Sequence, residues 1–215
     1  MNKRSILWFV PASLYVIFCL WYTNFSGPLT PAEIKTYMAL VEASNPPVQR
    51  IEQMRRFMEE DTGKQFFMIN VIDQADNPIP PKGAPADATA AELMNHYMEH
   101  MYPALFKRAS HPMYFGTAVS DTLDRTGLDE STAHWEQGAV FRYRSRRDML
   151  AIAMNPAFGE RHDYKIAALD KTLAYPTESE INLGDPRLFL FFIIGFVTAL
   201  LDIFIYGRRK ELSAA

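Results

Sequence analysis

The stretch that decides the fold runs from Trp135 to Pro176, WEQGAVFRYRSRRDMLAIAMNPAFGERHDYKIAALDKTLAYP. Its first part has the period of two that is typical of a strand, with Ala139, Phe141 and Tyr143 on one face and Val140, Arg142 and Arg144 on the other. The whole stretch predicts a strand, two helices and a closing strand in one unbroken run.

Capping residues and prolines divide the two predicted helices. Ser145, with Asp148 three residues later, can cap the first helix by accepting from unpaired amide groups. Asn155-Pro156 ends this helix, and Pro156 can open the next one. The second helix is expected to bury one stripe of side chains, which consists of Phe158, His162, Ile166 and Leu169. A short strand is expected at Thr172–Tyr175.

Three features of this stretch resemble the dimeric α/β-barrel superfamily, and most of all its branch of small bacterial proteins with no assigned function. These features are the run Phe141–Phe158, the pattern H-x-x-K-x-A-A-L-x-x-T that starts at His162, and the closing Tyr175-Pro176. The resemblance covers Gln65 to Pro176. It implies a ferredoxin-like βαββαβ unit whose sheet pairs with that of a second subunit. It implies no particular reaction, because the superfamily includes cofactor-free oxygenases, isomerases, haem enzymes and proteins of unknown role.

Two segments of the chain are almost purely apolar, Ser5–Tyr22 and Leu188–Tyr206. Each approaches the length of about 20 residues that a bilayer-spanning helix needs, so we expect two transmembrane helices. The first is expected to be an uncleaved anchor, because no small-x-small cleavage site follows it. The chain of 215 residues is 48% hydrophobic and 22% charged, and the part between the two segments suffices for one ordinary domain.

Basic residues set the expected orientation, because cytoplasmic flanks are enriched in Lys and Arg. Lys3 and Arg4 precede the first span and Arg208–Lys210 follow the second, whereas Arg187 stands alone at the opposite flank. We therefore expect a protein of the bacterial inner (plasma) membrane with both termini in the cytoplasm and a periplasmic domain. Asp202, inside the second span, should pair with a basic residue on the same membrane side: Lys3, Arg4 or Arg209.

The domain between the spans is acidic. Of the 22 basic and 25 acidic residues, sixteen and twenty-three lie between Thr23 and Pro186, which gives a net charge of about −7 and opposes nucleic-acid binding. The single cysteine, Cys19, lies within the first span and excludes a disulfide within the chain or a thiolate metal cluster. With no phosphate-binding glycine loop either, no cofactor is expected.

The fold class that we predict is α+β, with a ferredoxin-like domain between two transmembrane helices. The expected parts are an anchor over residues 1–23, a helical stalk over 24–64, the α+β domain over 65–186, a second transmembrane helix over 187–207 and a basic tail over 208–215. Further strands are expected at Phe66–Ile72 and Met113–Ser120, and a helix from Thr89 to Lys107. Both faces of the first strand are apolar, and we place Met68 on the face that a second subunit covers.

One metal-binding motif is present, His96-Tyr97-Met98-Glu99-His100, which matches the H-x-x-E-H pattern of inverted zinc proteases. Two histidines one helical turn apart can share a metal ion, and Glu178 or Glu180 could add a ligand. However, the apolar stripe of this helix consists of Met94, Tyr97, Met98, Met101 and Leu105. His96 and His100 lie on the opposite side, so we prefer a solvated helix face to a zinc site.

The candidate catalytic residues are His162, Arg142 and Tyr114. Burial on the apolar stripe would lower the pKa of His162. A neutral imidazole near Arg142, Tyr114 or Asn70 could polarise a carbonyl or accept a proton. The competing interpretation of His162 is a hydrogen-bonded core histidine. Arg142 and Arg144 could bind an anionic ligand or pair with acids at a subunit interface.

We expect a membrane-anchored binding or accessory module that forms a homodimer. The alternatives are a cofactor-free oxygenase or isomerase acting on a small hydrophobic compound in the barrel cleft, and a structural subunit bound to membrane-protein partners. An enclosed apolar pocket on which His162 and Arg142 converge would favour the enzyme. A cleft filled by side chains would favour a binding or structural role.

Overall fold

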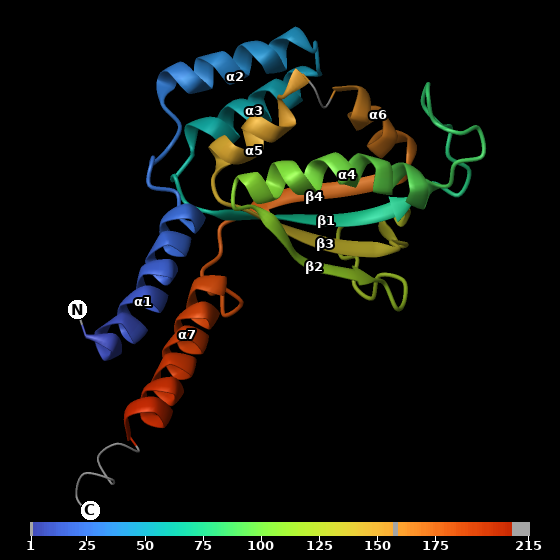
Figure 1. The fold of residues 1–215 in the computed structure, drawn as a ribbon. Coiled ribbons are helices and arrows are strands. Elements are labelled where there is room, and N and C mark those ends of the chain that lie inside the picture. The colour runs from blue at the N-terminus through green and yellow to red at the C-terminus, as the bar shows by residue number, and fades with distance from the viewer. Residues whose placement is uncertain (1, 157–158, 208–215) are drawn as a thin grey trace, which may run out of the picture. The chain divides into compact units, whose positions relative to one another are not determined.

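The computed structural model describes residues 2–156 and 159–207, which divide into two compact units (Figure 1). One unit combines the two terminal segments, up to Thr23 and from Ser179 onward, and the other runs from Asn24 to Glu178. The helical pair that precedes the sheet belongs to the second unit. Phe158 and the basic tail over 208–215 lie outside the described residues.

The terminal unit is a pair of antiparallel helices, α1 (Lys3–Tyr22) and α7 (Pro186–Asp202), the second continued by a π-helical turn (Ile203–Gly207). Arg4 donates to both carboxylate oxygens of Asp202, at 2.8 and 2.6 Å. Near the other end of the pair, the Tyr15 hydroxyl donates to the Arg187 carbonyl at 3.2 Å. The predicted pairing of Asp202 is confirmed, and Arg4 is the partner.

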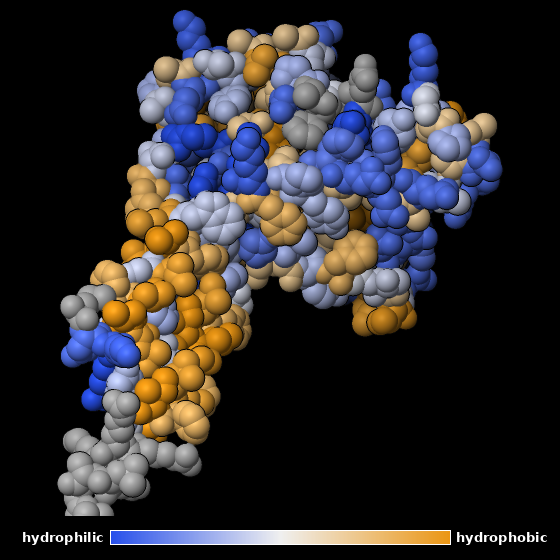
Figure 2. Space-filling view, in the orientation of Figure 1, coloured by the Kyte–Doolittle hydropathy of each residue, from blue (hydrophilic) through white to orange (hydrophobic). Residues whose placement is uncertain are grey.

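Most side chains on the surface of α1 and α7 are apolar (Figure 2). Phe9, Ile17 and Phe196, for example, are 59%, 62% and 67% exposed. Exposed apolar surface on this scale is unfavourable in water. The candidate spans are Lys3–Tyr22, with 20 residues, and Pro186–Gly207, with 22. Both helices are long and apolar enough to span a membrane.

The second unit contains a four-stranded antiparallel sheet with helices on one face (Figure 1). In chain order its elements are β1 (Phe66–Gln74), α4 (Ala90–Lys107), β2 (His111–Thr117), β3 (Gln137–Tyr143), α5 (Arg146–Ala153), α6 (Gly159–Ala167) and β4 (Leu169–Thr177). The strand order is β2-β3-β1-β4, with β1 antiparallel to both β3 and β4. The two central strands thus come from the predicted strands around Phe66–Ile72 and Ala139–Tyr143. The α+β class is confirmed.

Alternation along β1 divides the sheet into two faces. Phe66 packs against Leu105 of α4 and Ile152 of α5, and Met68 joins the same cluster. Met68 therefore lies on the helix-covered face, and its predicted place on the uncovered face is wrong. Phe67, Ile69 and Val71 point to the other side.

The uncovered side carries what we call the open sheet face, which consists of Ile69, Val71, Tyr114, Val140, Leu173 and Tyr175. Tyr114, Leu173 and Tyr175 are 58%, 47% and 46% exposed. Within the described part of this unit, no helix covers these side chains.

Helices α2 (Pro31–Ala43) and α3 (Val48–Glu59) pack against α5, not against the open sheet face. Met38 and Val41 of α2, Met58 of α3 and Leu150 of α5 form one buried cluster. Thr30 caps α2 and forms the predicted capping box with Glu33. The helical pair therefore thickens the helical layer on the covered side of the sheet.

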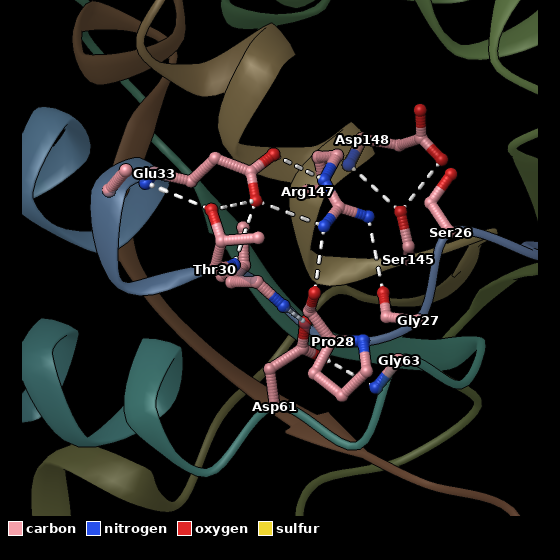
Figure 3. A network of polar contacts seen from close by, with 12 residues as sticks. Ser26, Gly27, Pro28, Thr30, Glu33, Asp61, Gly63, Ser145, Arg147 and Asp148 are labelled. Carbon is pink, nitrogen blue, oxygen red and sulfur yellow. Dashed lines mark hydrogen bonds and ion pairs between the residues drawn. The ribbon is translucent and has the colours of Figure 1, made fainter.

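A polar network ties this helical pair to α5 (Figure 3). The Arg147 guanidinium donates to the Glu33 carboxylate at 2.6 and 3.1 Å and to the carbonyls of Gly27 and Pro28 at 3.2 and 2.8 Å. Asp61 accepts from the amide of Leu29 at 2.8 Å. One side chain of α5 thus fixes the start of α2 through both charge and backbone contacts.

The last helix and strand differ from their predicted bounds. Helix α6 ends at Ala167, and Leu169 begins β4, which runs to Thr177. The stripe predicted for α6 is also wrong, because His162 and Ile166 are exposed and Ala168 is fully buried. A helix of nine residues presents only two turns, so its own pattern defines its buried side poorly.

Candidate functional site

A cavity of about 340 Å³ lies between α4 and the covered face of the sheet. Its size falls within the range of small-molecule sites. The α4 wall contains the predicted apolar stripe, with Met94, Tyr97, Met98 and Met101. The sheet contributes side chains from all four strands, among them Met68, Asn70, Phe115, Ala139, Phe141, Tyr143 and Thr172.

The cavity walls are mainly apolar and adaptable. Three methionines of α4 line the cavity, and an unbranched thioether side chain can adjust to ligands of different shape. Ala139 is small and 2% exposed, and it leaves space opposite them on β3. The cavity therefore suits a compact apolar molecule.

Tyr97, Tyr143 and Lys165 are among the polar side chains of the lining that have no protein hydrogen-bond or ion-pair partner within the described part of the chain. Burial raises the pKa of Tyr97 and, more strongly, that of Tyr143. The Tyr143 ring stacks on Phe66 with 5.3 Å between ring centroids. By contrast, the Asn70 amide is occupied, because it donates to the Met68 carbonyl at 3.0 Å and to that of Ala139 at 3.4 Å.

Lys165 of α6 is the one charged side chain that lines the cavity, counted over the residues described. Burial, and then the charge of Arg50, lower the pKa of its ammonium group. Its Nζ lies 5.9 Å from the centroid of the Tyr97 ring. The nitrogen thus combines a hydrophobic surrounding with a cation–π contact.

None of the three predicted catalytic residues lines this cavity. Arg142 is 1% exposed, and its guanidinium donates to the Gln65 side chain at 3.0 and 2.7 Å and to the Ala109 carbonyl. Tyr114 belongs to the open sheet face. Its ring lies so close to Gly116 that any side chain at position 116 would clash with it.

His162 is exposed on α6, away from the cavity lining. Partial shielding from water and the nearby charge of Lys165 lower its pKa, as predicted, although the residue is not in the core. Arg144 pairs with Asp148 of the same chain, at 2.8 and 2.9 Å. The predicted residues thus do not converge on one site.

The two histidines of the H-x-x-E-H motif contact α6. The His96 ring lies 4.4 Å from that of Tyr164, and Arg161 donates to Nδ1 of His100. A cation so close to His100 opposes metal binding at this nitrogen. Glu178, a possible third ligand, pairs with Arg146 at 3.0 Å. The expected solvated face is therefore partly covered by α6.

A different group could hold a metal ion: Asp73, His134 and Glu136, whose ligand atoms all lie within 4.8 Å of one another. Asp121 accepts from His134 at 2.9 Å and raises the pKa of this histidine. Lys171 lies 3.2 Å from the Asp73 carboxylate and already balances its charge. Asp73 and His134 thus already have charged partners within the protein.

Sequence reasoning missed Lys165. The lysine is part of the H-x-x-K pattern that starts at His162, but no role was assigned to it from the sequence. A lysine can bury its aliphatic stem, so helix periodicity assigns it to the surface by default.

The fold and this cavity define the class: an α+β protein with a four-stranded antiparallel sheet and a pocket beneath its helices. No protein-family profile matches the chain, and no curated protein matches it either. Among solved structures, the methylated form of RPA0582 is similar with a TM-score of 0.50 and 16% identity, over 65% of this chain and 96% of that one. A second structure of RPA0582, a protein of unknown function from Rhodopseudomonas palustris, has a TM-score of 0.47 and 16% identity. It covers 64% of the present chain and 96% of RPA0582.

A hydroxynitrile lyase from Passiflora edulis is also similar, with a TM-score of 0.34 and 13% identity, over 57% of this chain and 98% of that one. At such identities the likeness concerns the fold alone. The function must therefore be argued from the cavity.

Proposed function

We propose that the chain is a membrane-attached binding protein whose cavity takes a small, mainly apolar molecule. The observation that supports this most is the cavity of about 340 Å³ between α4 and the sheet, with its methionine and aromatic lining. A core without a ligand role is normally close-packed, with few voids larger than a water molecule. A cavity of this size in a small domain therefore favours a ligand.

The domain around the cavity is, in this proposal, ferredoxin-like. The support is the element order β1-α4-β2-β3-α5/α6-β4 together with the strand order β2-β3-β1-β4. A homodimer through the open sheet face completes the proposal, since that face is apolar and uncovered. The two apolar helices would attach the domain to the bacterial inner membrane, with the domain in the periplasm and both termini in the cytoplasm.

A binding role is preferred to the two alternatives. The cofactor-free enzyme predicted from the sequence would use His162 and Arg142 at the cavity, and neither residue lines it. A purely structural subunit would have no need for an open cavity with unpartnered polar groups. The condition that would favour an enzyme is met only in part, because the cavity is present but His162 and Arg142 do not converge on it. The other condition, a cleft filled by side chains, is not met in full either.

Photolabelling with benzophenone tests the proposal, because this molecule is neutral, apolar and small enough for the cavity. The full chain is placed in lipid nanodiscs and irradiated, and labelled peptides are identified by mass spectrometry. We expect label on α4 and β3 from the cavity. We also expect label on α1 and α7, because the probe partitions into the bilayer.

Two variants separate specific from non-specific label. Met98→Trp fills the cavity and should remove the label from α4 and β3 while the label on α1 and α7 persists. Glu99→Trp adds the same ring at a neighbouring side chain that is 66% exposed and lines no cavity, and should change nothing. Label on α4 and β3 that survives Met98→Trp would contradict the proposed pocket.

The proposed orientation has its own test. Reporter fusions at Asn2 and Ala215 should both indicate the cytoplasm, because basic residues favour that side. A periplasmic signal from either fusion would overturn the topology and the compartment of the domain, but not the pocket.

A further inference from the structure

The side chains that line the cavity carry a net positive charge. Among the described residues that line it, one is a lysine and none is an aspartate or glutamate. The other polar groups are amides and hydroxyls from residues such as Asn95, Gln137 and Thr172. The cavity of this acidic domain therefore contains one positive charge and no negative charge to balance it.

The position of Lys165 strengthens this point. Most basic side chains that pack inside this unit have an acidic or backbone partner: Arg147 has Glu33, Arg144 has Asp148, and Lys171 has Asp73. Lys165 is partly buried and has no ion pair or hydrogen bond to a described residue, and its Nζ lies 5.9 Å from the centroid of the Tyr97 ring. An ammonium group that is partly shielded from water and has no anion nearby is unfavourable, and an anion supplied by a ligand would relieve this.

The cavity lining contains two further donors. The hydroxyl groups of Tyr97 and Tyr143 belong to the same cavity lining and have no protein acceptor among the described residues. Both remain protonated at neutral pH, because burial raises their pKa values. An oxyanion could thus accept from an ammonium group and from phenol groups, while methionine and phenylalanine side chains surround the rest of the ligand.

We propose that the ligand is a monocarboxylate with a compact apolar body, and that Lys165 is the residue that recognises its carboxylate. This proposal rests on the proposed function, since it names the ligand class of the same cavity. The carboxylate compensates the lone charge, and the apolar body fills the space beside Met94, Met98 and Phe141.

Binding of a matched pair of probes tests the proposal. Naphthalene-2-carboxylate and naphthalene-2-carboxamide have the same shape and differ in charge. They are titrated calorimetrically into the full chain in nanodiscs, with empty nanodiscs as the blank. We expect the acid to bind about tenfold or more tightly than the amide, as charge-assisted hydrogen bonds imply. Undecanoate, with as many non-hydrogen atoms, shows whether a linear, lipid-derived acid or an aromatic acid is preferred.

Variants of Lys165 show whether this residue causes the preference for the acid over the amide. Lys165→Met keeps the length of the side chain and should remove the preference for the acid without weakening the amide, whereas Lys165→Arg should retain it. Lys107→Met alters an exposed lysine of α4 outside the cavity lining and should have no effect. Equal binding of the acid and the amide to the unchanged protein overturns the proposal, even if a variant fails to fold. A preference for the acid that survives Lys165→Met also overturns it. Failure of both probes to bind would overturn the pocket itself, which benzophenone labelling checks independently.

Discussion

At the scale of single residues, charged side chains in this protein mainly connect elements. Arg142, considered for anion binding on sequence grounds, is buried and holds the turn after α4 by donating to Ala109. Glu33 and Arg147 connect α2 to α5. The sequence shows that such residues are charged, but not which distant backbone groups they meet. The Ser145 cap, which is local, was predicted correctly.

Glu33 has a testable pH dependence. Its bonds from Arg147, and then from the Thr30 amide, lower its pKa from 4.5 to about 2. A carboxyl group with a lowered pKa stabilises the fold above its unfolded value near 4.5, and this contribution is lost as the pH falls toward 2. Glu33→Gln should therefore cost about 1–2 kcal/mol at pH 7, and less between pH 4.5 and 2. Glutamine retains the capping geometry, so the substitution isolates the charge.

Denaturant unfolding of the full chain in detergent, followed by tryptophan fluorescence at several pH values, measures this effect. The control is Glu42→Gln on the same helix, whose pair with Arg55 at 3.1 Å is about half exposed on both sides. This control should cost below about 0.5 kcal/mol. An effect of Glu33→Gln that does not change with pH would show that the charge is not what stabilises the contact.

At the scale of elements, the apolar pattern of a long helix predicted its buried side well, and that of a short helix predicted it poorly. The stripe of α4, 18 residues long, was assigned correctly, and four of its members line the cavity. The nine-residue α6 was assigned the wrong buried side, because packing against α4 determines its rotation. His96 and Tyr164 contact each other across this helix pair, and neither sequence segment contains information about the other.

The burial predicted for His162 was wrong for the same reason. His162 and Lys165 are three positions apart, so they are neighbours on the α6 surface, about 60° apart around the helix axis. A rotation of the helix decides which of them faces α4, and Lys165 does. The helices α1 and α7 needed no such information, because their apolar length is a property of each segment alone.

At the scale of the whole molecule, the open sheet face remains to be explained. The sequence correctly predicts that both sides of β1 are apolar. Within one chain, the only segment it offers to cover the outer side is Pro47–Glu60, which contains α3. The structure shows α2 and α3 packed on α5 instead, with Met58 and Leu150 in one cluster. This arrangement leaves a second copy of the chain as the occupant that we propose.

The final prediction is that Leu173→Asp converts a dimer into a monomer. Leu173 pairs with Val71 across the strands and is 47% exposed, so a charge there leaves the interior of one subunit intact. At about 25 cal/mol per Å² of buried apolar surface, covering several large side chains of the open sheet face contributes several kcal/mol to association. Sedimentation of the full chain in density-matched detergent should show two copies for the unchanged protein and one for the variant. Leu123→Asp, the same change at a loop residue that is 94% exposed, should remain dimeric. A monomer for the unchanged protein would mean that the open sheet face meets something other than a second copy.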